Sequence, residues 1–127
     1  MKKIGIKAGD TGVDIVAELY ETETAEKMAG ILPVKERVTL WGNEIYFPVN
    51  ISLEEEPGAR EILEAGELGY WPQGRVFCIF FGPTPVSIGN EPRAISNVNV
   101  FGKILSGFDV LKKVKQDDLI EVINIPQ

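Results

Sequence analysis

The sequence contains 127 residues, the size of one domain with a single hydrophobic core. It carries 13 lysine and arginine residues against 19 aspartate and glutamate residues, and this net charge of -6 argues against binding to nucleic acid or to an anionic membrane surface. The absence of histidine excludes Ser-His-Asp and Cys-His nucleophile systems, histidine acid–base catalysis and imidazole metal sites. Cys78 is the single cysteine, so an internal disulfide and a multi-cysteine cluster are excluded as well. We therefore expect neither a metal ion nor a cofactor.

Short runs in which polar and apolar residues alternate, rich in valine, isoleucine, phenylalanine and tyrosine, predict eight β-strands. We expect them at residues 3–8, 13–19, 35–41, 44–51, 67–71, 75–81, 97–104 and 119–125. Pro48 lies inside the fourth run and indicates an edge, a bulge or two shorter pieces. Strands at this spacing favour a closed or sandwiched antiparallel sheet, and eight strands can fill a barrel interior with side chains alone.

Two or three short helices complete the prediction. Thr22 can cap a helix that ends at Gly30, with acidic residues in its first turn. Further helices are expected at residues 57–66 and 108–114. No repeat or flexible linker divides the chain, so residues 1–127 are expected to form a single domain.

The chain contains no segment that resembles a targeting or membrane-spanning sequence. Its first residues alternate as in a strand and lack the apolar stretch of a signal peptide. The longest apolar run, residues 76–81, is far shorter than the roughly 20 residues needed to cross a bilayer. A cytoplasmic protein is therefore expected.

Few residues offer chemistry by themselves. The acidic residues 54–56 would point to alternate sides of a strand and are interpreted as a solvated loop. Cys78 lies in the most apolar strand, where a thiol behaves as a small hydrophobic group with a raised pKa. Tyr70 and Trp71 stand beside a turn; core packing is the favoured interpretation, and a surface platform for a ligand, with Trp71 exposed, is the alternative.

Several segments, in the same order along the chain, resemble the cyclophilins, a family of peptidyl-prolyl isomerases. They are IVAELY at 15–20 followed by TAEKM at 24–28, and VFGKI at 100–104 followed by GFDVLKKV at 107–114. More narrowly, GELGYWPQG at 66–74 and CIFFGPTP at 78–85 are similar to a signature of small atypical prokaryotic cyclophilin-like proteins. The resemblance implies a mainly β fold, the closed antiparallel eight-stranded cyclophilin barrel with two or three short helices.

The resemblance also implies where a substrate groove would lie, and there the sequence departs from the family. Val76 stands at the usual glutamine and Cys78 at the usual pocket phenylalanine, while Val98 falls near the usual histidine. No arginine is found around Tyr46, where the catalytic arginine is expected. We expect a substrate groove that includes Tyr46, Trp71, Val76, Cys78 and Val98, and we assign no catalytic residue.

Three functions stay open from the sequence. The first is a weak or divergent peptidyl-prolyl cis-trans isomerase with a degenerate active site. The second is a non-catalytic module of the same fold that binds a proline-containing peptide or protein, and the third is a barrel that binds an unrelated small ligand. Rotation about an X-Pro bond has a barrier of about 18–20 kcal/mol, and one preorganised donor typically contributes about 10²–10³ in rate. Without the arginine, efficient isomerisation is not expected.

Overall fold

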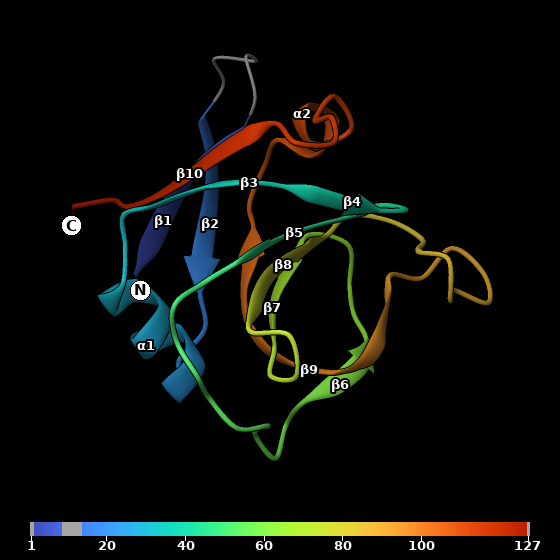
Figure 1. Cartoon of the computed structure of the whole chain (residues 1–127), viewed down its shortest axis with the longest axis horizontal. Coiled ribbons are helices and arrows are strands. Elements are labelled where there is room, and N and C mark those ends of the chain that lie inside the picture. Colours follow the sequence, from blue (N-terminus) through green and yellow to red (C-terminus); the bar gives the residue numbers. More distant parts are fainter. Residues whose placement is uncertain (1, 9–13, 127) are drawn as a thin grey trace.

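The computed structural model describes residues 2–8 and 14–126, and in these residues one antiparallel sheet of ten strands wraps around an apolar core (Figure 1). The strands are β1 (Lys3–Ala8), β2 (Asp14–Leu19), β3 (Val34–Arg37), β4 (Thr39–Trp41), β5 (Glu44–Pro48), β6 (Arg60–Ile62), β7 (Glu67–Trp71), β8 (Val76–Phe80), β9 (Arg93–Ile104) and β10 (Leu119–Asn124). The helices are α1 (Glu23–Gly30) and α2 (Phe108–Leu111). The mainly β fold is therefore confirmed. Residue 13, the expected first residue of the second strand, lies outside the described residues.

The sheet is not closed by hydrogen bonds, which corrects the expected closed barrel. Its order is β3-β10-β1-β2-β9-β7-β8-β5-β4, with β6 paired to β9 off this path. The two end strands, β3 and β4, are consecutive in the chain and are separated by Val38 alone. One extended segment therefore pairs with β10 through its first half and with β5 through its second half, and it joins the two ends of the sheet.

The predicted strand at 35–41 is divided at Val38 for a local reason. The Val38 N–H donates to the carbonyl oxygen of Asp118 at 2.9 Å, and its carbonyl accepts from the Asp117 N–H at 3.0 Å. Both partners lie in the turn before β10, so the backbone at Val38 leaves one ladder and enters the next. The Val38 side chain is buried in the core at this point.

The core is built from the inward-facing residues of the strands. Phe47 and Phe77 stack with ring centroids 4.7 Å apart, and Phe101 meets Phe77 edge-on at 5.1 Å. The ring of Tyr70 is fully buried, and its hydroxyl donates to the Ile51 carbonyl at 2.8 Å. The core interpretation is therefore confirmed for Tyr70.

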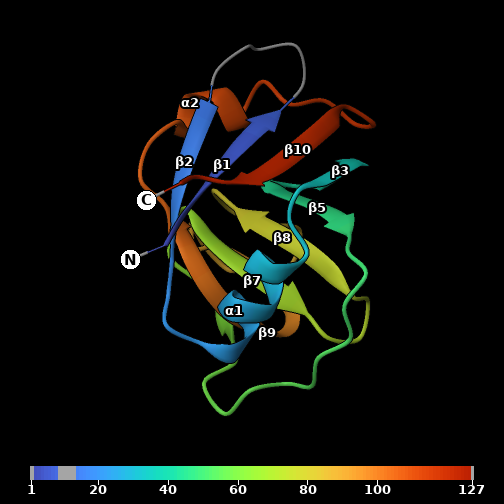
Figure 2. The same ribbon diagram turned by 90° about the vertical axis from the view of Figure 1, so that its left-hand side faces the viewer.

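The two helices cover opposite ends of the sheet interior (Figure 2). The hydroxyl of Thr22 accepts a hydrogen bond from the Ala25 N–H at 3.0 Å, so the predicted cap of α1 is confirmed. α1 buries Met28 in the core, and α2 buries Leu111. α2 ends at Leu111, three residues before the predicted end.

The predicted helix at 57–66 is wrong, because part of this segment forms β6 on the outside of β9 (Figure 1). The Leu63 N–H donates to the Pro92 carbonyl at 3.0 Å, and the Glu64 N–H donates to the Glu67 carboxylate at 2.8 Å. These backbone donors are therefore used by partners outside a helix. The same pairing explains why β9 begins at Arg93, four residues before the predicted start.

An ion pair holds β6 against β7. Arg60 donates from both terminal nitrogens to Glu67, at 2.8 Å each, and Glu67 is 1% exposed. The Tyr20 hydroxyl donates to the same carboxylate at 2.9 Å. Burial raises the pKa of the Glu67 carboxyl, but the hydrogen bonds from Arg60, Glu64 and Tyr20 outweigh this effect and hold the pKa below its usual value.

Replacing Arg60 by methionine is expected to lower the free energy of unfolding by about 1–3 kcal/mol at pH 7, because a buried carboxylate loses its charged partner. The stabilisation of Glu67 is present above the pKa of an unfolded carboxyl and is lost as the pH falls, so the difference should narrow at acid pH. Urea denaturation at several pH values measures it. Arg37→Met, at an exposed arginine that bonds the Asp117 carbonyl, is the control and should stay within about 0.5 kcal/mol of the parent. Equal losses in the two variants would contradict the structural role of the Arg60–Glu67 pair.

Candidate functional site

The candidate site lies on the outer face of the sheet, where β5, β7 and β8 run side by side. On β8 the side chains of Phe77 and Ile79 enter the core, so those of Val76, Cys78 and Phe80 face outward. The antiparallel register places Tyr46 of β5 opposite Cys78, and Trp71 of β7 opposite Val76. Side chains from three strands are thereby brought to one surface.

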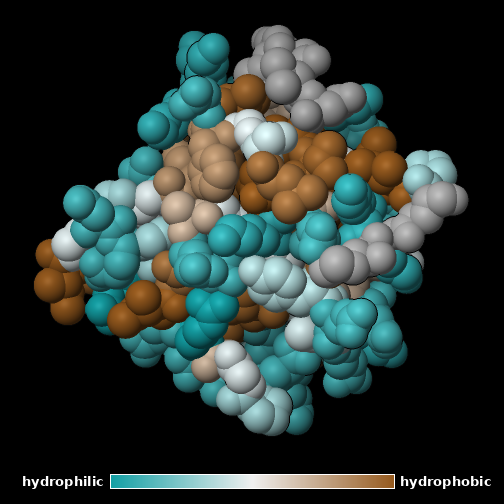
Figure 3. All heavy atoms as spheres, turned by 180° about the vertical axis from the view of Figure 1, so that it is seen from behind, coloured by the Kyte–Doolittle hydropathy of each residue, from teal (hydrophilic) through white to brown (hydrophobic). Residues whose placement is uncertain are grey.

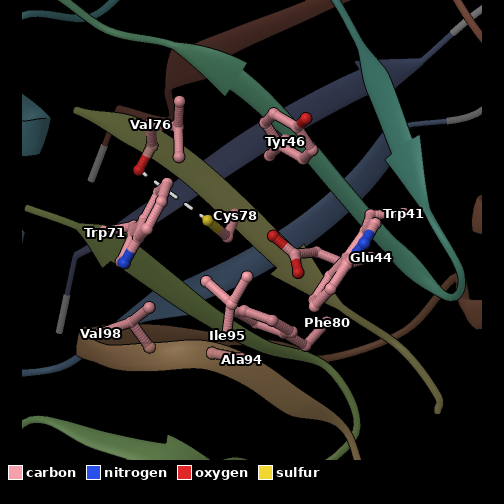
Figure 4. Close-up of a pocket in the computed structure, with 10 residues that line it drawn as sticks. All are labelled: Trp41, Glu44, Tyr46, Trp71, Val76, Cys78, Phe80, Ala94, Ile95 and Val98. Atoms are coloured by element: carbon pink, nitrogen blue, oxygen red, sulfur yellow. Dashed lines mark hydrogen bonds between the residues drawn. The ribbon is translucent and has the colours of Figure 1, made fainter. Parts of the chain in front are cut away.

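A pocket of about 230 Å³ opens on this surface (Figure 4). The structure brings all five predicted groove residues together in its lining; whether they contact a substrate stays a prediction. The lining residues are Trp41, Glu44, Tyr46, Trp71, Val76, Cys78, Phe80, Ala94, Ile95 and Val98.

Half of this lining was not predicted from the sequence. Glu44 carried a usable signal, because it lies two residues before Tyr46 and therefore shares its face of the strand. Trp41 follows from the β4–β5 hairpin, in which Gly42 has a φ of 60° and brings β4 beside β5. Ala94 and Ile95 carried no such signal, because they reach the pocket only through the early start of β9.

The floor of the pocket is a second apolar cluster, separate from the core. It consists of Leu63, Cys78, Phe80, Ala94, Val98 and Val100. Gly69 permits this arrangement, since a Cβ at that position would lie 2.8 Å from Cγ2 of Val98. The absent side chain at Gly69 lets β9 place Val98 against the strand.

The ring of Trp71 is fixed at one side of the pocket. Its Nε1 donates to Oγ of Ser96 at 2.6 Å. A Cβ at Gly74 would lie 2.5 Å from Cε3 of Trp71, so the ring packs against the turn that follows β7. Trp71 is half-buried and lies outside the core, in contrast to Tyr70. The favoured core interpretation therefore does not hold for Trp71, and its role as a platform for a ligand stays a prediction.

Glu44 is an ionisable group inside the pocket. Its side chain points to the centre of the pocket beside Cys78 (Figure 4), and the residue is 6% exposed. Burial raises the pKa of the Glu44 carboxyl to about 7, although the neighbouring Cys78 thiol opposes the rise. Glu44 therefore changes its charge near neutral pH.

Cys78 has the properties of a structural cysteine. It is 2% exposed, and burial together with the neighbouring Glu44 carboxylate raises the pKa of the Cys78 thiol well above its usual value. The reactive form of cysteine is the thiolate, which is disfavoured here. Cys78 therefore contributes volume to the pocket, and its thiol donates a weak hydrogen bond to the Val76 carbonyl at 3.9 Å.

No arginine or lysine belongs to the pocket lining within residues 2–8 and 14–126. Arg60 is engaged by Glu67, and Arg93 by Glu91. Arg75, which directly precedes Val76, is exposed in the turn before β8 with a φ of 52°. None of them replaces the arginine that the family resemblance would require.

The acidic residues that the structure describes outside the pocket do not gather as a set of metal ligands. In the part of the chain that the structure describes, no group of three or more cysteine or carboxylate side chains could hold a metal ion. Within residues 54–56, Glu56 is used internally, because its carboxylate accepts from the Thr24 hydroxyl at 2.9 Å. Over the same described residues, no helix is long and apolar enough to span a membrane.

Glu44→Gln is expected to remove a pH dependence of stability. The protonated Glu44 carboxyl is compatible with burial, and the ionised one is not. Its contribution to stability is therefore fully present below the pKa of an unfolded carboxyl, near 4.5, and is lost as the pH rises through about 7. The parent should thereby lose about 3 kcal/mol of unfolding free energy over this range, and the variant should not. Denaturation at pH 4.5 to 8 measures the two profiles. The exposed Glu54 provides the control variant Glu54→Gln; parallel profiles for all three proteins would contradict the raised pKa.

The comparisons with known proteins agree with this fold. The model of the cyclophilin-like family matches residues 2–123. A hypothetical protein from Archaeoglobus fulgidus, whose structure was determined in solution, is similar to this chain at 32% sequence identity with a TM-score of 0.80. The similarity covers 98% of this chain and 95% of the archaeal one. No curated protein matches the sequence. The family match spans nearly the whole chain and includes every strand of the pocket, so this protein belongs to the cyclophilin-like family.

Proposed function

We propose that this protein is a non-catalytic binding module, in which the pocket on the outer face of the sheet holds one residue of an extended segment of a partner protein. The observation that carries the proposal is the lining itself: aromatic and aliphatic side chains surround a cavity that has no guanidinium or ammonium group among its described residues. Such a pocket offers apolar contact area without a fixed positive charge to stabilise a twisted amide.

The size of the pocket supports binding of a single side chain. Its volume of about 230 Å³ is below the roughly 300–1,000 Å³ of pockets that enclose drug-sized ligands. A proline ring or one side chain of similar size fits this scale better than a whole cofactor. A proline-containing peptide is therefore the first ligand to test.

The surroundings of the pocket favour a protein partner. Ile95 at the rim is 60% exposed, and Ile62 on neighbouring β6 is 50% exposed. The loop between β8 and β9 presents Ile88, which is 87% exposed, and internal hydrogen bonds hold this loop, such as that from the Thr84 hydroxyl to the Arg93 carbonyl at 2.6 Å. Figure 3 shows apolar atoms at the left-hand edge of the molecule, the edge at which this loop protrudes. Exposed apolar side chains around a pocket are typical of an interaction surface.

A weak isomerase is the second candidate, and Glu44 is the observation that favours it. A protonated carboxyl can donate one hydrogen bond, and a carboxylate cannot. Any isomerase activity that depends on this donor should fall as the pH rises through about 7, because Glu44 then ionises. This pH dependence distinguishes it from an isomerase that uses a guanidinium group.

The two tryptophans of the sequence both line the pocket, so their signals report on it directly. We expect an Ala-Ala-Pro-Phe peptide to shift both indole N–H resonances in ¹⁵N–¹H spectra and to show no accelerated isomerisation at any protein concentration. Ile95→Asn should weaken binding about tenfold through lost apolar contact, whereas Leu105→Asn, at an equally apolar exposed position outside the pocket, should not.

Two results would contradict this proposal. Acceleration in proportion to protein concentration would establish the isomerase instead. Unmoved indole resonances with every extended peptide tested, proline-containing or not, would exclude a peptide-binding role for the pocket.

A further inference from the structure

The pocket combines four aromatic side chains, of which Phe80 is fully buried, with one buried acid. Trp41 comes from β4, Tyr46 from β5 and Trp71 from β7, and they stand around the cavity in which the Glu44 carboxyl lies (Figure 4). Among the described residues, the close ring pairs are those of Phe47, Phe77 and Phe101 in the core. Among the described residues, Trp41, Tyr46 and Trp71 form no such close pair with one another, and each of the three rings lines the pocket.

Glu44 has no cationic partner in the described pocket. The other ionisable side chains in the lining are the Cys78 thiol, which faces Glu44 from β8, and the phenol of Tyr46 on its own strand. A neutral apolar ligand would cover the carboxyl further and leave its ionised form without compensation. A cationic ligand would supply the missing charge in the same place.

Aromatic faces attract cations, and tryptophan does so most strongly. Two tryptophans, a tyrosine and a carboxylate around one small cavity are the elements from which binding sites for quaternary ammonium groups are built. The net charge of -6 of the whole chain favours the same class of ligand. The chemistry of the pocket is thus complementary to an organic cation.

The polar groups of the lining favour a methylated ammonium group over a free one. A lysine ammonium has three N–H donors, each of which needs an acceptor when it leaves water. In the described lining, the Glu44 carboxylate is the one charged acceptor, and the other side chains are mainly apolar. Methyl groups replace the donors and contact the rings instead.

We propose that the pocket binds a methylated ammonium group carried on a lysine side chain of the partner segment, with Glu44 neutralising its charge and Trp41, Tyr46 and Trp71 surrounding its methyl groups. That the group belongs to a protein segment rests on the function proposed above. The preference of the pocket for a methylated cation rests on the lining alone.

Choline and its neutral isostere 3,3-dimethylbutan-1-ol test the charge preference on the full chain, with tryptophan fluorescence and the indole N–H resonances as readouts. We expect choline to bind at least tenfold more tightly than the alcohol at pH 8. Its affinity should rise several-fold from pH 6 to pH 8, as Glu44 ionises, while that of the alcohol should not rise. Equal affinity for the two probes would overturn the proposal.

Glu44→Gln keeps the size of the side chain and removes its charge, and it should abolish the advantage of choline over the alcohol. Glu54→Gln, at an exposed acid outside the pocket, should keep that advantage. An amide-resonance spectrum like that of the parent verifies that each variant is folded. An unchanged choline affinity in a folded Glu44→Gln variant would overturn the role of this carboxylate.

Peptides distinguish the source of the cation. A short extended peptide containing trimethyllysine should bind more tightly than the same peptide with unmodified lysine or with norleucine. If the norleucine peptide binds as tightly, the binding module stands and the cation preference falls. If choline binds and no peptide does, the cation preference stands and the assignment to a protein side chain is overturned, together with the proposed function.

Discussion

The structure depends on β8, whose side chains point alternately to the two faces of the sheet. Both faces of this strand are covered by other side chains. Phe77 and Ile79 complete the core, while Val76, Cys78 and Phe80 lie against a second apolar cluster on the outside. A strand of an antiparallel sheet usually faces water on one side. Here β9 bends over that side with β6 on its edge, so a pocket forms on the outside of the sheet while its interior stays filled with side chains.

Two buried acids on this outer face differ in how their charge is compensated. Glu67 and Glu44 are 1% and 6% exposed. Glu67 receives donors from Arg60, Tyr20 and the Glu64 backbone, and its charge is fully compensated. Glu44 lies beside a thiol, and its pKa is raised to about 7. A carboxylate that is satisfied internally secures β6, whereas one without a charged partner keeps its capacity to interact with a ligand.

The sequence predicted the strands well where alternation is local and failed where pairing is distant. Four of the five groove residues, those on β5, β7 and β8, meet because each of these strands keeps a period of two, which is visible in residues 44–48, 67–71 and 76–80. The helix predicted at 57–66 is wrong because the backbone of this segment bonds to Pro92 and Glu67. A local sequence pattern does not show that these two residues lie beside it. Ala94 and Ile95 were missed for the same reason, since their place in the pocket follows from the pairing of β6 with β9. The position of Glu44 is predictable from the local pattern, because a residue two positions before Tyr46 shares its face of the strand.

The departure from the cyclophilin pattern does more than remove a hydrogen-bond donor. It replaces a positively charged group in the pocket by a negatively charged one. An isomerase that stabilises a twisted amide with a guanidinium group presents a positive charge to a carbonyl or amide group of its substrate. In the described lining of this pocket the charged group is a carboxylate, and the arginines of β6 and β9 are held by Glu67 and Glu91. An arginine introduced beside Tyr46 would therefore lie next to Glu44. The Glu44 carboxylate would form an ion pair with its guanidinium group and compensate the positive charge. For this reason we infer that a single substitution does not convert this pocket into that of an ordinary cyclophilin, and the preference for cations that we propose depends on Glu44 rather than on the family to which the fold belongs.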